Sequence, residues 1–259
     1  MLAEPSPLDT GGGAADYGRM PPSTSFFTAA SLRFLRALAR NNRRDWFEAH
    51  RHDYETAILF PMRDFVEEMD VRLARLAPEM VGDPKRSIFR IYRDVRFSKD
   101  KSPYKTHAAC WFFHRDASHR VGQESHGGGA GFYFHVQPGA CLDAGGVWMP
   151  PREALGKLRD AMAAKPAQFT RVVSAPAVVR RFGELDTDAV LKRVPRGYPP
   201  DHAAAKWLRY QSFTMGRMLS DAQITSARLP ALVADDFALL LPLVRWINGA
   251  LGLKSAERR

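Results

Sequence analysis

The fold is decided by the stretch Gly131-Phe-Tyr-Phe-His-Val-Gln137, which is followed by Pro138-Gly139 and then by Cys141-Leu-Asp-Ala-Gly-Gly-Val-Trp-Met149. Aromatic residues and a valine fill the first run, and a Pro-Gly pair separates it from a second run of similar length. Two such runs around a short turn predict antiparallel strands joined as a hairpin. The sequence therefore places an antiparallel sheet in the middle of the chain.

More strands are expected on either side of this hairpin. Ala108 to His114 is apolar and aromatic, and Ile88 to Phe97 mixes β-branched, aromatic and basic residues. We expect both to be strands, and we expect another at Lys206 to Thr214. The polar stretch from Arg115 to Ala130, which ends in three glycines, predicts a loop.

Helices are predicted before and after the strands. Apolar residues recur at helical spacing from Phe27 to Leu38, with an end at Asn41-Asn42, and from Met62 to Leu76, after a kink or restart at Pro61. A helix opens at Pro150-Pro151, helical pieces continue to about Phe182, and Leu229 to Val244 suggests a closing helix interrupted by Pro242. This order predicts an α+β fold, in which an antiparallel β-sheet packs against N-terminal and C-terminal helices.

The composition sets the domain organisation. Residues 1–24 are rich in Pro, Gly, Ser and Ala, which is typical of a disordered tail. We expect residues 25–252 to form a single α+β domain and residues 253–259 to be a frayed C-terminus. Cys110 and Cys141 lie in apolar stretches, which favours buried free thiols over a disulfide.

The net charge of +10 over 259 residues favours acidic partners such as nucleic acid, phosphate metabolites or anionic membranes. An arginine excess of this kind also arises from genome base composition alone. The first residues lack a secretory signal, and the apolar stretch Phe237 to Leu251 is too short and interrupted to span a bilayer. We therefore expect a cytoplasmic protein without a membrane partner.

Positive charge is densest in residues 85–107, where eight Lys and Arg residues face only Asp94 and Asp100. If Ile88 to Phe97 is a strand, Arg90, Tyr92, Asp94 and Arg96 share one face, and Arg93 lies on the apolar face, where it must be paired. Pro103 and an Asx-type turn at Asp100 would hold Lys101, Tyr104 and Lys105 in fixed places. Fixed cations suit phosphate or carboxylate recognition. The alternative is a structural Arg-Asp network that locks loops onto the N-terminal helices.

The block Arg90-Ile-Tyr-Arg93-Asp94-Val-Arg96-Phe97-Ser-Lys-Asp100-Lys101-Ser-Pro103-Tyr104 resembles the signature RxxRDxRFxxDKxPY of an uncharacterised bacterial and fungal family, a domain of unknown function. All fixed positions of that signature are matched. Phe34 to Phe47, Gly131 to Gly139 and Lys192 to Tyr198 also resemble the family, so the resemblance covers roughly residues 26–250. It implies no activity, only that this block is the shared feature of the family.

Candidate roles follow from residue type. We expect the anion to be bound by Arg90, Arg93, Arg96, Lys101 and Lys105, with Arg193 added from the Pro/Gly-rich segment at residues 193–201. The candidate catalytic residues, which would move protons, are Asp94, Tyr104 and His135. His107, at the start of the strand that follows the block, is a further candidate, and a structural role is the default for both histidines.

No metal site is expected, because His50 and His52 would point about 200° apart on a helix and no other group has metal-ligand spacing. The sequence has no phosphate-binding P-loop, dinucleotide fingerprint or serine nucleophile elbow, so no cofactor is assigned.

Two functions remain open. The first is binding of a phosphorylated or carboxylated small molecule in a basic cleft, with or without catalysis. The alternative is a nucleic-acid-binding or accessory module, in which the same cations contact phosphates and Tyr92, Phe97 or Tyr104 stack on bases. The two aspartates among the cations favour a shaped pocket over a phosphate track, and hence the first function.

Overall fold

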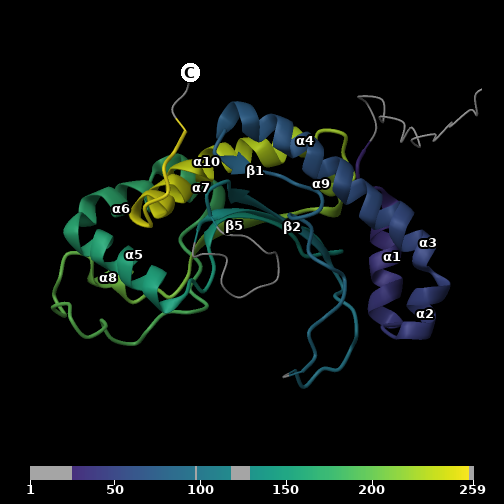
Figure 1. Cartoon of the computed structure of the whole chain (residues 1–259), viewed down its shortest axis with the longest axis horizontal. Helices are drawn as coiled ribbons and strands as arrows, with labels where there is room; N and C mark the ends of the chain where they lie inside the picture. The colour runs from purple at the N-terminus through teal and green to yellow at the C-terminus, as the bar shows by residue number, and fades with distance from the viewer. Residues whose placement is uncertain (1–24, 97, 118–128, 257–259) are drawn as a thin grey trace, which may run out of the picture.

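The computed structural model describes residues 25–96, 98–117 and 129–256, and its centre is a five-stranded antiparallel sheet (Figure 1). The strand order is β1-β2-β3-β4-β5, the same as the order along the chain. The strands are β1 (Met80–Val81), β2 (Ala108–His114), β3 (Gly131–Val136), β4 (Cys141–Val147) and β5 (Phe213–Leu219).

The predicted hairpin is confirmed as the β3–β4 pair. Its turn is closed by a hydrogen bond of 2.8 Å from the Ala140 N–H to the Gln137 carbonyl. Gly139 has a φ of 76°, which the position after Pro138 in such a turn requires. The β2 prediction, Ala108 to His114, is confirmed at both ends.

The N-terminal helices are α1 (Ala29–Arg40), α2 (Arg44–Ala49), α3 (Arg51–Tyr54), the π-helical turn η1 (Glu55–Leu59) and α4 (Phe60–Leu76). Thr28 caps α1 in a capping box with Ser31, and α1 ends at Asn41, whose side chain donates to the Ala37 carbonyl. The chain does not break at Pro61. It passes through the π-helical turn η1 into α4, and Pro61 is the second residue of α4, directly after this turn.

The C-terminal helices are α5 (Arg152–Ala164), α6 (Pro166–Val173), α7 (Pro176–Phe182), α8 (Ala205–Leu208), α9 (Asp221–Ile224) and α10 (Leu229–Ala250). Pro242 lies inside α10 without ending it. The predicted α+β architecture, with helices at both ends of the chain around an antiparallel sheet, is therefore confirmed. Among the described residues, no helix combines the length and the apolar character needed to cross a membrane.

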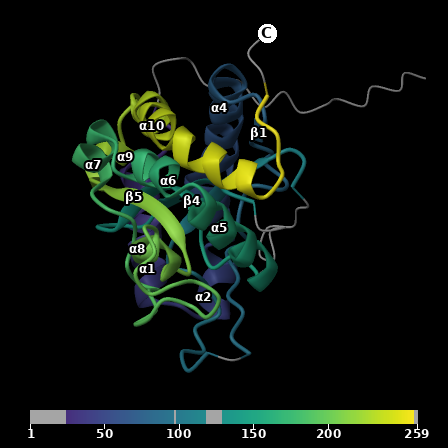
Figure 2. The ribbon, with the colours of Figure 1, turned by 90° about the vertical axis from the view of Figure 1, so that its left-hand side faces the viewer.

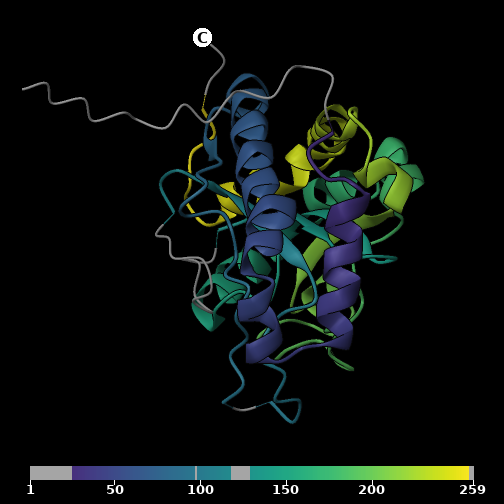
Figure 3. The ribbon, with the colours of Figure 1, turned by 90° about the vertical axis from the view of Figure 1, so that its right-hand side faces the viewer.

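The two faces of the sheet differ in what lies against them. Helices α4 and α10 lie together across one face (Figure 1), where Phe132 stacks on Phe237 and Phe134 packs on Phe65, with ring centroids 4.5 Å apart in both pairs. Helices α1 to α3 lie on one side of the sheet and α5, α6 and α8 on the other, as Figures 2 and 3 show from the two ends. On the sheet face opposite α4 and α10, side chains such as Tyr133 are half-buried rather than buried.

Two strand predictions are wrong. Ile88 to Arg96, the described part of the strand predicted at Ile88 to Phe97, is no strand, because the chain bends at Ile91 and keeps only isolated bridges from Ile88 to Cys110 and from Tyr92 to Tyr104. At Lys206 to Thr214, helix α8 ends at Leu208 and β5 begins only at Phe213. Apolar runs this short do not separate helix from strand by their periodicity, and here burial against Phe169 favours a helical turn at Trp207.

Cys110 and Cys141 are free and buried, as predicted. Other predictions concern segments that are wholly or partly outside the described residues: the tail at 1–24, the loop centre at 118–128, Phe97 and the end at 257–259.

Candidate anion-binding site

The basic block forms a bent hairpin that extends the edge of the sheet. Residues 87–93 run antiparallel to residues 103–111. The Phe89 N–H donates to the Ala109 carbonyl at 3.0 Å, and the Lys105 N–H donates to the Ile91 carbonyl at 2.8 Å. The segment 94–102 is therefore the tip of this hairpin, and Lys105 lies at its base, next to β2.

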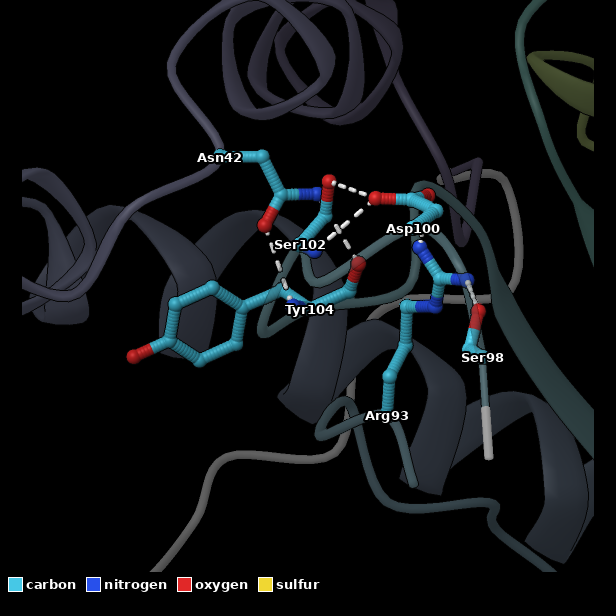
Figure 4. A network of polar contacts seen from close by, with 6 residues as sticks. All are labelled: Asn42, Arg93, Ser98, Asp100, Ser102 and Tyr104. Atoms are coloured by element: carbon cyan, nitrogen blue, oxygen red, sulfur yellow. Dashed lines mark hydrogen bonds and ion pairs between the residues drawn. The ribbon is translucent and has the colours of Figure 1, made fainter. Parts of the chain in front are cut away.

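Asn42 fastens the hairpin to the N-terminal helices. Its side-chain amide donates to the Tyr104 carbonyl at 2.9 Å, and its side-chain oxygen accepts from the Tyr104 N–H at 3.0 Å (Figure 4). The Tyr104 ring is buried and stacks on Phe47 in α2, with ring centroids 4.1 Å apart. Burial also raises the pKa of Tyr104. Tyr104 is thus an anchor of the hairpin, on the core side of the site.

The tip is held by an ion pair between Arg93 and Asp100 (Figure 4). Asp100 also accepts hydrogen bonds from the Ser102 hydroxyl at 2.6 Å and from the Ser102 N–H at 2.9 Å. These bonds from Ser102, followed by the bond from Arg93, hold the pKa of Asp100 well below its usual range. Arg93 is half-buried and paired, although the strand from which its pairing was predicted does not form.

The other charges of the tip also have protein partners. Arg96 pairs with Asp94, with Nη2 and Oδ2 2.7 Å apart, and this guanidinium lowers the pKa of Asp94 to about 2. The Lys101 ammonium donates to the Val95 carbonyl at 2.9 Å. Arg93, Arg96 and Lys101, three of the five cations predicted in the block, are therefore engaged within the hairpin itself.

Arg90 and Lys105 differ from these three. Neither forms a salt bridge within residues 25–96, 98–117 and 129–256. Lys105 is half-buried, and its ammonium nitrogen lies 5.2 Å from the centroid of the Phe89 ring. Burial, followed by repulsion from Arg90, lowers the pKa of Lys105. Lys105 thus lies beside a second cation and has no carboxylate partner among the described residues, whereas the charge of Arg90 also acts on Asp94.

Lys105 belongs to what we call the open-face cluster, which lies where the hairpin joins the sheet, on the face opposite α4 and α10. The rings of His107 and His135 are 5.4 Å apart, and Tyr133 is 5.5 Å from His135 and 6.0 Å from Phe89. The cluster arises because β2 and β3 pair with Ala109 opposite His135, so that alternate residues of both strands share this face. Its members are Phe89, Lys105, His107, Tyr133 and His135.

His135 has both ring nitrogens engaged. Nε2 lies 2.5 Å from the Ala140 carbonyl, which can only accept, so Nε2 carries the proton. Nδ1 lies 3.1 Å from the Tyr133 hydroxyl and accepts from it when the ring is neutral. Burial lowers the pKa of His135, which favours this neutral form. His135 therefore orients Tyr133 and the β3–β4 turn.

His107 has no hydrogen-bond partner among the described residues. Its ring is half-buried, and burial, followed by the positive charges of His135 and Lys105, lowers its pKa to about 4. The imidazole is thus neutral at neutral pH, with one ring nitrogen able to accept a hydrogen bond or a proton. Its place just after the basic block was the only sequence signal for this residue.

A family model described as conserved hypothetical protein (DUF2461) matches residues 30–246. The chain belongs to this family. No curated protein matches the chain. No solved structure matches it either. The description of the DUF2461 family names no activity, so the function has to be argued from the geometry.

Arg193 lies elsewhere in this DUF2461 fold. Val190, three residues before it, bridges to Tyr210, next to β5, and Arg193 itself is exposed. The basic hairpin extends the β2 edge, so the width of the sheet separates Arg193 from Lys105. The structure does not bring Arg193 to the block. The described residues also contain no group of three or more His, Cys, Asp or Glu side chains that could hold a metal ion.

Proposed function

We propose that the protein binds a phosphorylated or carboxylated small molecule at the open-face cluster, with Lys105 and Arg90 contacting the anion. One observation carries this proposal: half-buried Lys105 lies beside Arg90 and has no carboxylate partner among the described residues. A partly buried cation without a counter-ion is unfavourable. A bound phosphate or carboxylate would supply the missing negative charge through charge-assisted hydrogen bonds.

The other predicted residues take supporting roles in this proposal. Arg93, Arg96, Lys101, Asp94 and Tyr104 hold the hairpin in shape, and the shape of the hairpin sets the place of Lys105. His107 is the residue best placed to accept a proton from the ligand, because its ring is neutral and free of protein hydrogen bonds in the described structure. His135 keeps Tyr133 oriented beside it.

Thermal unfolding in the presence of inorganic phosphate or succinate tests the proposal. We expect either anion to raise the melting temperature of the wild type, by an amount equivalent to about 2.7 kcal/mol at a hundredfold excess over Kd. Lys105→Met should abolish this shift and should stabilise the free protein slightly, because it removes the repulsion from Arg90. Lys99→Met, which changes an exposed lysine of the same hairpin, is the matched control. Equal shifts in wild type and Lys105→Met would contradict the proposal.

Nucleic-acid binding is the second candidate, and one observation favours it. Tyr92 is 45% exposed and lies two residues from exposed Arg90, so it is available for stacking on a base. Tyr104, in contrast, is buried, and Phe97 lies outside the described residues. Titration with single-stranded RNA at increasing salt separates the two candidates. Affinity that falls steeply with salt and survives Lys105→Met supports the alternative, and no binding at low salt removes it.

A further inference from the structure

Two aspartates meet in the core between β4 and α10, on the face of the sheet opposite the open-face cluster. Asp143 in β4 and Asp236 in α10 are both fully buried, with 0% exposure. Two arginines approach the pair, Arg217 from β5 and Arg181 from α7. From β3, the residue opposite Asp143 is the uncharged Phe134. Four elements thus contribute charged groups to one buried cluster.

Both arginines form ion pairs with Asp236, and neither pairs with Asp143. Arg181 Nε lies 2.5 Å from Oδ1 of Asp236, and Arg217 donates to Oδ2 from Nη2 at 2.6 Å and from Nε at 2.8 Å. Arg217 lies opposite Asp143 in the β4–β5 register, yet these hydrogen bonds go to Asp236. Neither carboxyl oxygen of Asp143 receives a hydrogen bond from the described residues.

A fully buried carboxylate without a donor is strongly disfavoured, whereas a neutral carboxylic acid has an O–H that can donate. Two carboxyl groups that share a site cannot both ionise easily, so one of them keeps a proton. Burial raises the pKa of Asp143, and its contact with Asp236 raises it further, against the opposing effect of the two arginines. The arginines decide which partner is ionised, because they bind Asp236.

We propose that Asp143 is held as a neutral carboxylic acid whose O–H donates a hydrogen bond to the Asp236 carboxylate. This contact, which we call the latch, fastens β4 to α10. Loss of the proton places a second negative charge beside Asp236 in the core and weakens the contact. The latch is independent of the anion site and uses none of its residues.

The sign of the pH dependence follows from the direction of the shift. Above the ordinary pKa of 3.8, the unfolded chain has lost this proton while the folded chain retains it. The unfolded state therefore binds fewer protons, and stability falls as the pH rises from that value to the raised pKa of Asp143. Below the ordinary pKa both states are protonated, and the contribution of the latch is fully present.

Infrared spectroscopy of the full chain tests for the proton directly. We expect the wild type to show a protonated-carboxyl band at about pH 7, where an ordinary aspartate is ionised. Asp143→Asn should remove this band and still fold, because its amide can donate to Asp236 as the acid does. Asp186→Asn is the control. Desolvation also raises the pKa of Asp186, which lies outside the cluster, and this variant should retain the band.

Thermal unfolding supplies the second measurement. The difference in melting temperature between wild type and Asp143→Asn should change between about pH 5 and about pH 8, with the wild type losing more as the pH rises. No band in the wild type at neutral pH, or parallel melting curves across that range, would overturn the latch. If Asp143→Asn does not fold, a band that persists at neutral pH in both wild type and Asp186→Asn supports the latch, and its absence from the wild type refutes it.

Discussion

At the residue scale, the charged block is largely occupied with its own shape. Asp100 pairs with Arg93 and accepts a hydrogen bond from Ser102, and Asp94 pairs with Arg96. Asn42 forms hydrogen bonds with both backbone groups of Tyr104. Each of these contacts fixes part of a hairpin that has few backbone hydrogen bonds of its own. The side chains that remain for a ligand are Arg90, Lys105 and His107, and Lys105 and His107 lie at the base of the hairpin, where it meets the sheet.

Replacing Asn42 tests how much the hairpin depends on this docking contact. Asn42→Ala leaves the Tyr104 N–H and carbonyl without partners, so we expect the free energy of unfolding to fall by about 2 kcal/mol or more. Asn41→Ala is the matched control: it removes one side-chain bond at the end of α1 and should cost about 1 kcal/mol. Urea denaturation measures both losses, and equal losses would show that the two hydrogen bonds between Asn42 and Tyr104 do not hold the hairpin in place.

The lowered pKa of His107 predicts that the free energy of unfolding decreases as the pH falls below 6.5. Its pKa falls from 6.5 in the unfolded chain to about 4 in the folded chain, so the unfolded state takes up a proton first as the pH falls. Stability is therefore lost between these two values, by about 1 to 3 kcal/mol. Urea denaturation at about pH 7 and about pH 4.5 should show a smaller loss for His107→Gln than for the wild type. His52→Gln, at an exposed position, should behave like the wild type.

At the scale of elements, the junction of β4 and β5 tolerates the least change. Gly146 has a φ of 131°, and a Cβ atom there would lie 1.9 Å from the Phe213 carbonyl oxygen. The two strands pair along their whole length around this point. A side chain at Gly146 must therefore displace the backbone of β5. This strand also holds Arg217, which pairs with Asp236 in α10.

Gly146→Ala should accordingly destabilise the protein by at least about 2 kcal/mol, because it combines backbone strain with a clash. Gly156→Ala is the control. Gly156 lies in α5 with nothing within 4 Å of the position of a Cβ atom, so this change should stabilise the helix by about 0.5 to 1 kcal/mol. Thermal unfolding distinguishes the two, and a neutral Gly146→Ala would contradict the close pairing of β4 with β5 at this position.

Helices and turns whose own residues show a sustained spacing or a turn pair could be predicted from the sequence. Strands that form only because they pair with a neighbouring strand could not. The helical spacing from Met62 to Leu76 and the Pro-Gly turn each carry their own local signal. Met80–Val81 is a strand only because it pairs with β2, and the bend at Ile91 breaks a run whose composition favours a strand. For the candidate site, the sequence singled out the charged segment from Arg90 to Lys105. It offered an Arg-Asp network as an alternative, but it did not indicate which aspartate pairs with which arginine, because those pairings are set by the folded hairpin.

At the scale of the whole molecule, α10 runs across the sheet from its β5 edge to its β1 edge. Its Phe237 ring stacks on Phe132 and meets Phe112 edge-on, with centroids 4.5 and 5.7 Å apart. Near its other end, Arg245 pairs with buried Glu79 beside β1, at 2.7 Å. One helix thus contacts residues next to both edges of the sheet, through Glu79 and through Arg217.

Phe237→Ala should therefore lower the free energy of unfolding by about 3 to 5 kcal/mol, since it opens a cavity between α10 and two strands. Trp148→Ala removes an aromatic side chain of larger size that is 73% exposed, and it should change stability by no more than about 0.5 kcal/mol. Denaturation with guanidinium compares them. Similar losses in both variants would show that the centre of the core lies elsewhere.

The position of α10 along the chain has a consequence for synthesis. Strands β1 to β5 end at Leu219, whereas α10 runs from Leu229 to Ala250. During translation the strands leave the ribosome before α10. Phe132 and Phe112 therefore stay without the Phe237 ring that packs on them until α10 has been made. A nascent chain at that stage exposes an apolar surface, which is the kind of surface that chaperones bind and that promotes aggregation. Slow translation over the codons of α10 would prolong this stage, so the yield of folded protein should depend on how fast the last helix is made.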